Sequence, residues 1–90
     1  MLRLDLSNDA RRSISTRQPK HQRQIVAKIQ DLRRDPQPVD SKQLKGTSRG
    51  FRRADVGEYR VIYKTENEVL YVSAVGKRND DEIYRQLRGR

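Results

Sequence analysis

Four segments of the chain are predicted to be strands, and alternation of apolar and polar residues, which is typical of strands, is the clearest signal among them. In the first segment Leu2, Leu4 and Leu6 share one face, which predicts a half-buried strand. In the last segment both faces are partly apolar, as expected of a strand in the middle of a sheet. The predicted strands cover residues 2–6, 51–54, 59–65 and 69–75.

Three other segments carry apolar residues three or four positions apart, as on one face of a helix. The first of them follows Ser7, a residue type that caps helices, and places Asp9 where the helix dipole favours an anion. It is expected to end near Thr16. The last helix can be capped by Asn79 or Asp80 and has two apolar residues four positions apart.

The longest helix is predicted to begin at Pro19, because proline suits the first turn of a helix. It is expected to end at Asp35, since the residue before Pro36 is pushed out of the helical region. Residues 36–41 are expected to be a connector. One apolar stripe runs along this helix and consists of Ile25, Val26, Ile29 and Leu32.

These elements follow one another in the order β-α-α-β-β-β-α. The order predicts an α+β fold, in which helices, including an N-terminal helical hairpin, pack on one face of a small, mainly antiparallel sheet. A chain of 90 residues has room for one hydrophobic core, so residues 1–90 are expected to form a single domain.

Composition narrows the choice of partners. The formal net charge of +9 points to nucleic acid, an anionic membrane or an acidic protein. The chain has no cysteine and one histidine, His21, so neither a disulfide framework nor a zinc site is expected. No apolar run approaches the roughly 18 residues of a membrane span, and the N-terminus does not resemble a signal peptide. A soluble cytoplasmic protein without a membrane partner is predicted.

A cluster of basic residues precedes and enters the strand at 59–65. Arg60 lies within that strand between two apolar neighbours, where a long charged side chain needs a partner. A phosphate group is one candidate partner, and a structural ion pair with Glu58 or Glu66 is the other. The basic residues of this stretch are Lys45, Arg49, Arg52, Arg53 and Arg60.

A second group of cations follows the strand at 69–75, at Lys77 and Arg78. Tyr84 comes shortly afterwards, beside the apolar stripe of the last helix. It either packs that helix onto the sheet or brings a phenol to a phosphate. His21 is expected to be an exposed helix residue, and one histidine alone builds no Ser-His-Asp set.

Three segments together resemble the RelE/ParE superfamily of bacterial toxins, and the RelE branch most closely. They are residues 35–46 (DPQPVDSKQLKG), residues 56–63 (VGEYRVIY) and residues 75–78 (VGKR) with Tyr84 behind them. The resemblance covers the whole chain. It implies a ribosome-dependent endoribonuclease that cleaves mRNA in the decoding site and is neutralised by a cognate antitoxin. It implies no metal and no small-molecule cofactor.

The resemblance also implies roles for three residues. Arg60 would stabilise the pentacovalent phosphate, and Arg78 would neutralise or protonate the leaving oxygen. Tyr84 would help to take the proton from the attacking 2′-hydroxyl. Fixed arginines suit this chemistry because negative charge develops on phosphate oxygens. Contacts with ribosomal and messenger RNA are expected from Lys45, Arg52, Arg53 and Lys77.

The chain departs from its relatives at two places. Arg52 and Arg53 are adjacent, so alternation sends them to opposite faces, and which one faces RNA is open. Lys77 stands where relatives often have histidine. Because the gyrase-poisoning ParE branch shares the fold, a topoisomerase inhibitor that acts by binding is the main alternative function. A non-catalytic RNA-binding relative is the other.

Overall fold

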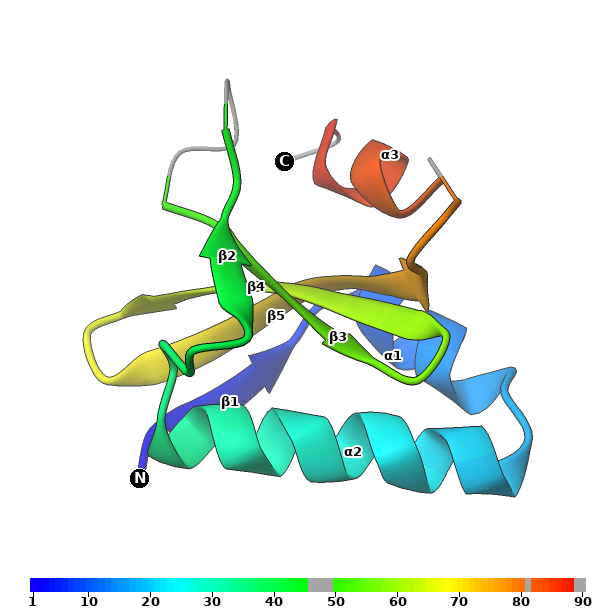
Figure 1. The fold of residues 1–90 in the computed structure, drawn as a ribbon, viewed down its shortest axis with the longest axis horizontal. Coiled ribbons are helices and arrows are strands. Elements are labelled where there is room, and N and C mark those ends of the chain that lie inside the picture. The colour runs from blue at the N-terminus through cyan, green and yellow to red at the C-terminus, as the bar shows by residue number, and fades with distance from the viewer. Residues whose placement is uncertain (46–49, 81, 89–90) are drawn as a thin grey trace.

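The computed structural model describes residues 1–45, 50–80 and 82–88 (Figure 1). In these residues the predicted elements form, together with one short additional strand. The elements are β1 (Arg3–Leu6), α1 (Asn8–Ser15), α2 (Pro19–Arg34), β2 (Ser41–Gln43), β3 (Arg52–Val56), β4 (Tyr59–Glu66), β5 (Val69–Lys77) and α3 (Glu82–Arg88).

The strands form one sheet in the order β1-β5-β4-β3-β2. β1 pairs with β5 in parallel, and the other neighbouring strands pair antiparallel. The predicted α+β class with a mainly antiparallel sheet is therefore confirmed. β5 lies between β1 and β4, as expected from its two partly apolar faces.

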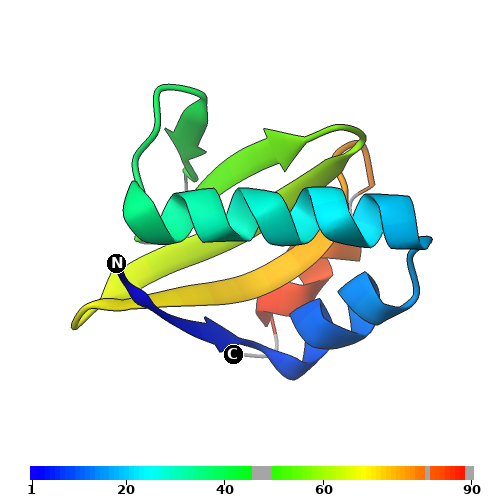
Figure 2. The same ribbon diagram turned by 90° about the horizontal axis from the view of Figure 1, so that it is seen from below.

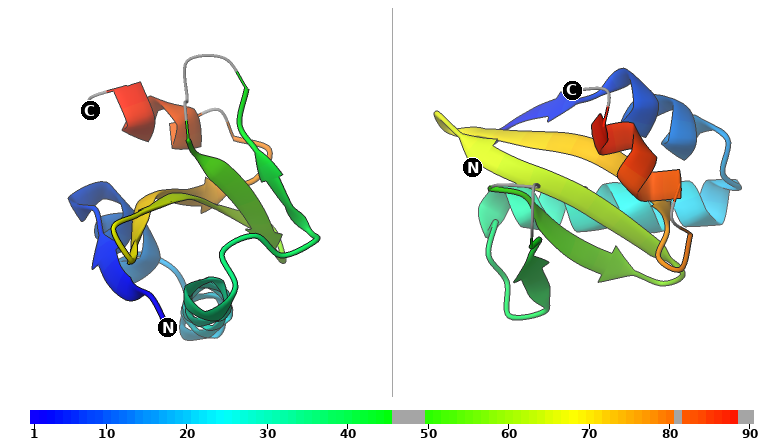
Figure 3. Two further views of the ribbon diagram at one scale, coloured as in Figure 1. Left: turned by 90° about the vertical axis from the view of Figure 1, so that its left-hand side faces the viewer. Right: turned by 90° about the horizontal axis from the view of Figure 1, so that it is seen from above.

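Helices cover both faces of the sheet. The helices α1 and α2 lie on one face, and α3 lies across the other (Figures 2 and 3). Alternation along β4 explains the two layers, because Val61 packs into the α1–α2 core whereas its neighbour Ile62 packs against Ile83 of α3. The expectation that the helices share a single face is wrong for α3.

The larger core fills the space between the sheet and the two N-terminal helices. From α2, the side chains of Ile25, Ile29 and Leu32 are buried, and each stabilises the fold by roughly 1.5–3 kcal/mol relative to an exposed position. Val26, predicted to belong to the same stripe, is 44% exposed. Tyr63 is fully buried and contributes the largest side chain of this core.

The smaller core lies under α3 and holds this helix against the sheet. Ile62, Ala74 and Ile83 are its buried members. Gly76 packs directly against this helix, since a Cβ atom built at this position would be in van der Waals contact with the Cβ of Ile83 at 3.4 Å. Tyr84 packs at the edge of this core, and its position is thereby set by the approach of α3.

Ser7 joins the first helix to the sheet. Its hydroxyl oxygen accepts a hydrogen bond from the backbone N–H of Ala10 at 3.0 Å, as the sequence predicts for an N-cap. The same hydroxyl donates to the backbone oxygen of Ser73 on β5 at 2.9 Å. One side chain thus begins α1 and fixes it beside β5.

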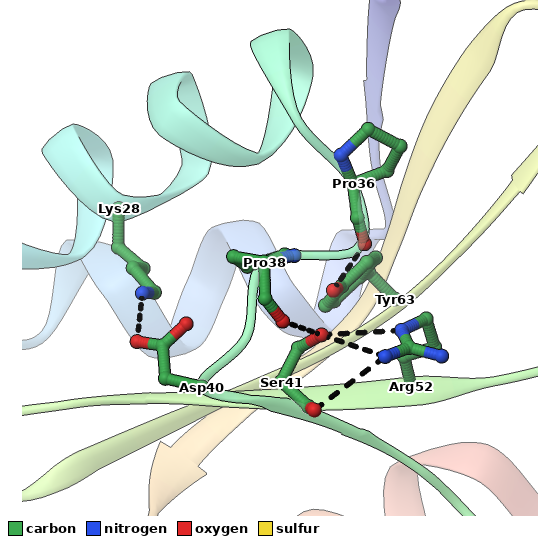
Figure 4. Close-up of polar contacts among 7 residues, drawn as sticks. All are labelled: Lys28, Pro36, Pro38, Asp40, Ser41, Arg52 and Tyr63. Carbon is green, nitrogen blue, oxygen red and sulfur yellow. Dashed lines mark hydrogen bonds and ion pairs between the residues drawn. The ribbon is translucent and has the colours of Figure 1, made fainter.

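The strand β2 was not predicted, because its sequence Ser-Lys-Gln has no apolar alternation. Tertiary contacts hold it beside β3 instead (Figure 4). Ser41 accepts hydrogen bonds at its hydroxyl from Nη2 and Nε of Arg52, at 2.8 and 3.2 Å. Nearby, the Tyr63 hydroxyl donates to the backbone oxygen of Pro36 at 2.6 Å, and Lys28 pairs with Asp40 at 2.8 Å.

Within the described residues, none of the helices is long and apolar enough to cross a membrane.

Candidate functional site

Arg60 lies in the middle of the sheet on the face that α3 covers. On β4 it is paired across the strands with Asp55 of β3 and Gly76 of β5. Its side chain is only 14% exposed. Since the side chain of Ile62 points to the same face, Arg60 stands beside the small core under α3.

Asp55 forms a two-pronged ion pair with Arg60. Nε of Arg60 donates to Oδ1 of Asp55 at 2.8 Å, and Nη2 donates to Oδ2 at 3.4 Å. An ion pair was one of the two expectations for Arg60, but the predicted partners Glu58 and Glu66 are wrong. Both glutamates are exposed.

The ion pair alters the acidity of both groups. The hydrogen bond from Arg60 holds the pKa of Asp55 below its usual value of 3.8, against the opposing effect of burial. The positive charges of Arg53 and Arg78 lower it further. The pKa of Arg60 is raised, first by the hydrogen bond with Asp55 and also by Tyr84, so its guanidinium stays charged.

Tyr84 brings a phenol from α3 to the same guanidinium. Nη1 of Arg60 donates to the Tyr84 hydroxyl oxygen at 2.8 Å. The packing role expected for Tyr84 is confirmed, because its ring packs at the small core. Its hydroxyl meets a cation, and its contact with a phosphate stays a prediction. The structure therefore brings together two of the predicted catalytic residues, and they come from different elements.

Arg60 still has N–H groups that these contacts do not use. A guanidinium has five N–H groups. Asp55 and Tyr84 accept from three of them, which leaves two for another acceptor. A phosphate that receives two N–H bonds from one arginine is a strong and directional arrangement. Arg60 can thus be oriented by Asp55 and still bind an anion.

Arg78 follows β5 and is exposed. Its backbone N–H donates to the backbone oxygen of Glu58 at 3.0 Å, so it is fixed beside the turn that joins β3 to β4. Its charge affects Asp55, as described above, which places it in the electrostatic surroundings of the Arg60 site. Its side chain is open to solvent.

The four residues predicted to contact RNA are not gathered at one place. Arg53 shares the face of Arg60, because it is paired with Ile62 and lies two residues from Asp55. Arg52 points to the opposite face, where its guanidinium donates hydrogen bonds to the hydroxyl oxygen of Ser41 on β2 (Figure 4). Of the two arginines, Arg53 is therefore the one on the face of the candidate site.

The other two predicted RNA contacts lie outside the Arg60 site. Lys45 is exposed at the end of the described segment after β2. Lys77 is exposed at the end of β5, and its neighbour Gly76 is the residue that faces α3. Lys77 therefore points toward the α1 side of the sheet. Arg49 of the basic stretch falls outside the described residues.

Residues 6–82 match the sequence family described as "ParE toxin of type II toxin-antitoxin system, parDE". The chain belongs to this family. It is a toxin of a type II toxin–antitoxin system, and the predicted membership of the RelE/ParE superfamily is confirmed. No curated protein matches the chain in sequence.

Solved toxin structures have the same fold as this ParE-family chain. The RelBE2 complex from Mycobacterium tuberculosis is 24% identical, with a TM-score of 0.75, over 86% of this chain and 98% of that one. The archaeal RelE–RelB complex from Pyrococcus horikoshii is 24% identical, with a TM-score of 0.74, over 87% and 96%. Isolated RelE from E. coli is 22% identical, with a TM-score of 0.75, over 99% and 97%.

Two residues with tertiary contacts in this toxin were missed in the sequence, one at the Arg60 site and one on the opposite face of the sheet. The first is Asp55, which could have been found from the two-residue turn that starts at Gly57. In a hairpin with such a turn, Val56 pairs with Tyr59 and Asp55 consequently pairs with Arg60. The signal was therefore present in the spacing.

The second missed residue is His21, which is not the exposed helix residue that was expected. Its Nδ1 lies 2.8 Å from the hydroxyl oxygen of Tyr59, and the two rings are 5.1 Å apart. The guanidinium of Arg17 lies 5.0 Å from the centre of the same tyrosine ring. No spacing in the sequence indicates these contacts, because they join α2 and the α1–α2 connection to β4.

The Asp55–Arg60 pair predicts a change of stability with pH. Because folding lowers the pKa of Asp55, the stabilisation is complete above about pH 4 and is lost as the pH falls through the lowered value. Asp55→Asn should therefore lower the free energy of unfolding of the toxin at pH 7, and should lower it by less near pH 3. Urea unfolding at both pH values measures this.

A double-mutant cycle provides the control for this pH effect. In an Arg60→Gln background the Asp55→Asn change should lose most of its pH dependence, because the hydrogen-bonded cation is gone and only the weaker effects of Arg53 and Arg78 remain. An Asp55→Asn effect of equal size at both pH values would contradict the ion pair.

Proposed function

We propose that this toxin is a ribosome-dependent endoribonuclease that cleaves mRNA in the decoding site. The observation that carries the proposal is the 2.8 Å contact between Nη1 of Arg60 and the hydroxyl of Tyr84, on a face that also holds Arg53. A phenol fixed beside a guanidinium provides a proton-transfer group next to a phosphate-binding group. Ribosomes place this activity in the cytoplasm.

The proposed reaction begins with attack of a ribose 2′-hydroxyl on the adjacent phosphorus. The bond from the 2′-oxygen to phosphorus forms and the bond from phosphorus to the 5′-oxygen breaks. The leaving 5′-oxygen takes up a proton from solvent water, so the products are a 2′,3′-cyclic phosphate and a 5′-hydroxyl end. Tyr84 assists removal of the 2′-proton. Arg60 donates its two remaining N–H groups to the phosphate as negative charge develops.

Arg78 has a separate part in this mechanism. It is exposed and fixed by its backbone beside the β3–β4 turn, so its side chain can extend to the leaving 5′-oxygen and neutralise the charge there. Asp55 acts as a positioning residue, because it binds one side of the Arg60 guanidinium and leaves the remaining donors for substrate. These roles require neither a metal ion nor an organic cofactor.

The direct test is in vitro translation of a defined message with the purified toxin, followed by primer extension. Cuts in the message that follow the codon register, and that require ribosomes, are the expected result. An intact message at toxin concentrations that stop protein synthesis would overturn the proposal.

A topoisomerase inhibitor that acts by binding is the second candidate. Two observations favour it: the matched family carries the ParE description, and the carboxylate of Asp55 offsets the charge of Arg60. This candidate predicts an unbroken message together with loss of gyrase supercoiling activity. Both assays on one preparation of toxin therefore separate the two functions.

A cognate antitoxin is the proposed partner for either function. The solved relatives from Mycobacterium tuberculosis and Pyrococcus horikoshii are toxin–antitoxin complexes. In this chain a groove of about 340 Å³ runs between β1, α1 and α2, and most of its lining is apolar. The groove suits the apolar face of an amphipathic helix, and the charge of +9 suits an acidic one. Its apolar side chains are Leu4, Leu6, Ile14, Val26 and Ile29.

Val26→Asp is therefore expected to weaken antitoxin binding by about 1–3 kcal/mol, since it places a carboxylate in the apolar groove. Calorimetric titration of the variant with the antitoxin measures the loss. Val39→Asp is the matched control, because Val39 is fully exposed at 104% in the connector after α2. Equal affinity of the two variants would place the antitoxin elsewhere.

A further inference from the structure

A second basic site lies on the far flank of α3 from Tyr84. It is a groove of about 460 Å³ between α1 and α3, with the end of β5 as its floor, and is called the α1–α3 groove below. Its cations come from three elements, namely Arg12 and Arg17 of α1 and its C-terminal turn, Lys77 of β5 and Arg85 of α3.

The groove exists because β1 is much shorter than β5. β1 ends at Leu6, opposite Val72, while β5 continues to Lys77. Beyond Val72, the edge of β5 that faces away from β4 has no neighbouring strand among the described residues, and α1 and α3 lie there instead. Gln86 of α3 donates from Nε2 to the backbone oxygen of Val75 at 3.3 Å and so closes part of the open edge.

The charge in the groove favours an anion. Four cations line it against two carboxylates, Asp9 and Asp80. Asp9 lies 3.9 Å from Arg12 in an exposed pair, which contributes little because solvent screens it. The lining therefore carries an excess of positive charge, held on elements that the packing of the fold fixes in place.

Each wall of the groove also carries one buried polar atom that the described part of the fold leaves without a hydrogen-bond partner. Among the described residues, Nε of Arg17 and Oε1 of Gln86 are the buried side-chain atoms without a hydrogen-bond partner, and both residues line this groove. Leaving such a group unpaired costs about 1–3 kcal/mol, so native structures seldom retain one without a reason. Arg17 is otherwise held in place, by Ser13 at 3.2 Å and by the ring of Tyr59.

The groove and the Arg60 site are joined by the turn from β5 to α3. Arg78 affects Asp55 on one flank of α3, and its neighbour Lys77 lines the groove on the other. Figure 3 shows α3 lying across the sheet, with α1 beyond one of its flanks and β3 and β4 on the other. A single strand of RNA that crosses this turn can therefore contact both sites with successive phosphates.

We propose that the α1–α3 groove binds the phosphodiester backbone of the RNA strand next to the cleaved position, as a second phosphate subsite. The inference rests on the proposed ribonuclease function. RNA suits the groove better than an acidic helix does. The apolar side chains that the structure describes along the groove are limited to Val75 and Ile83, and both are buried. An amphipathic helix requires a continuous apolar seam, which the β1–α1–α2 groove supplies instead.

The test measures the binding of short and long single-stranded RNA, of about 4 and about 12 nucleotides, made uncleavable with 2′-deoxyribose. Fluorescence anisotropy over a range of salt concentrations gives the affinity and its salt slope. Lys77→Gln combined with Arg12→Gln should lower the affinity for the long RNA about tenfold and flatten the slope by about 1.4. The affinity for the short RNA, which reaches only the Arg60 site, should not change.

Matched controls separate the groove from general charge loss and from catalysis. Arg23→Gln and Arg34→Gln on α2 together remove two positive charges from exposed positions, as the groove variant does. This control variant should still bind the long RNA more tightly than the short RNA. Arg60→Ala should slow cleavage by about 10²–10³ but still bind the long RNA more tightly than the short RNA. A toxin that does not cleave mRNA but keeps this pattern would refute the nuclease and leave the groove as an RNA site.

Two results would overturn the groove proposal itself. One is an equal loss of affinity for long RNA in the groove variant and the α2 control variant. The other is unchanged RNA binding in the groove variant together with weaker antitoxin binding, which would assign the groove to the antitoxin. Circular dichroism of each variant confirms that the fold is retained.

Discussion

Tyr84→Phe is expected to lower the single-turnover rate of mRNA cleavage on programmed ribosomes by roughly 10²–10⁴, the contribution of a general acid–base group. The substitution keeps the ring that packs at the small core and deletes the hydroxyl that accepts from Arg60 at 2.8 Å. Ribosome binding should therefore be unchanged. Single-turnover conditions are needed because product release would otherwise mask the chemical step.

The Tyr84→Phe result also separates the two readings of this residue. If the hydroxyl served packing alone, the variant would cleave at the full rate, and Tyr84 would leave the mechanism. Tyr71→Phe is the matched control, since Tyr71 lies half-buried on β5 and loses the same atom. It should cleave like the wild type.

Arg60→Ala is expected to lower the cleavage rate by about 10²–10³, the usual effect of removing one donor that stabilises a developing oxyanion. The loss should appear in the rate of the chemical step rather than in ribosome affinity, because the charge on the phosphate grows only in the transition state. Arg78→Ala should cost a similar amount.

The Arg60 experiment needs a control for structure, because the change also removes the partner of Asp55. Asp55→Ala combined with Arg60→Ala leaves no unpaired carboxylate, so it should restore stability without restoring activity. Arg60→Lys keeps the charge but not the planar fork, and an intermediate rate is expected. Full activity in Arg60→Lys would show that charge alone suffices. Full activity in Arg60→Ala would remove Arg60 from the mechanism.

Several features of this toxin depend only on residues that are neighbours in the sequence. The apolar pattern placed β1, β3, β4 and β5 correctly, and Ser7 and Pro19 marked where the first two helices begin. These signals lie within a few neighbouring residues, because strand alternation and helix caps depend on short-range geometry. The fold class and the toxin family could both be recognised from them.

Other features depended on segments distant in the sequence. The strand β2 forms only because Arg52 and the edge of β3 are beside it, and α3 crosses to the second face because Ile62 and Ala74 offer an apolar surface there. The hairpin spacing was sufficient to pair Asp55 with Arg60. The contact of Arg60 with Tyr84 was not readable from spacing, since 24 residues separate them and packing of α3 brings them together.

The amino-acid composition sets the chemistry available to this toxin: a large excess of arginine and lysine, one histidine, no cysteine, and a phenol near the end of the sequence. Folding then brings particular groups together. It turned Arg53 toward Arg60 and Arg52 away, and gave Arg60 a carboxylate and a phenol as partners. The physical reason is that side-chain direction follows strand register and layer packing, which pairing between distant segments sets.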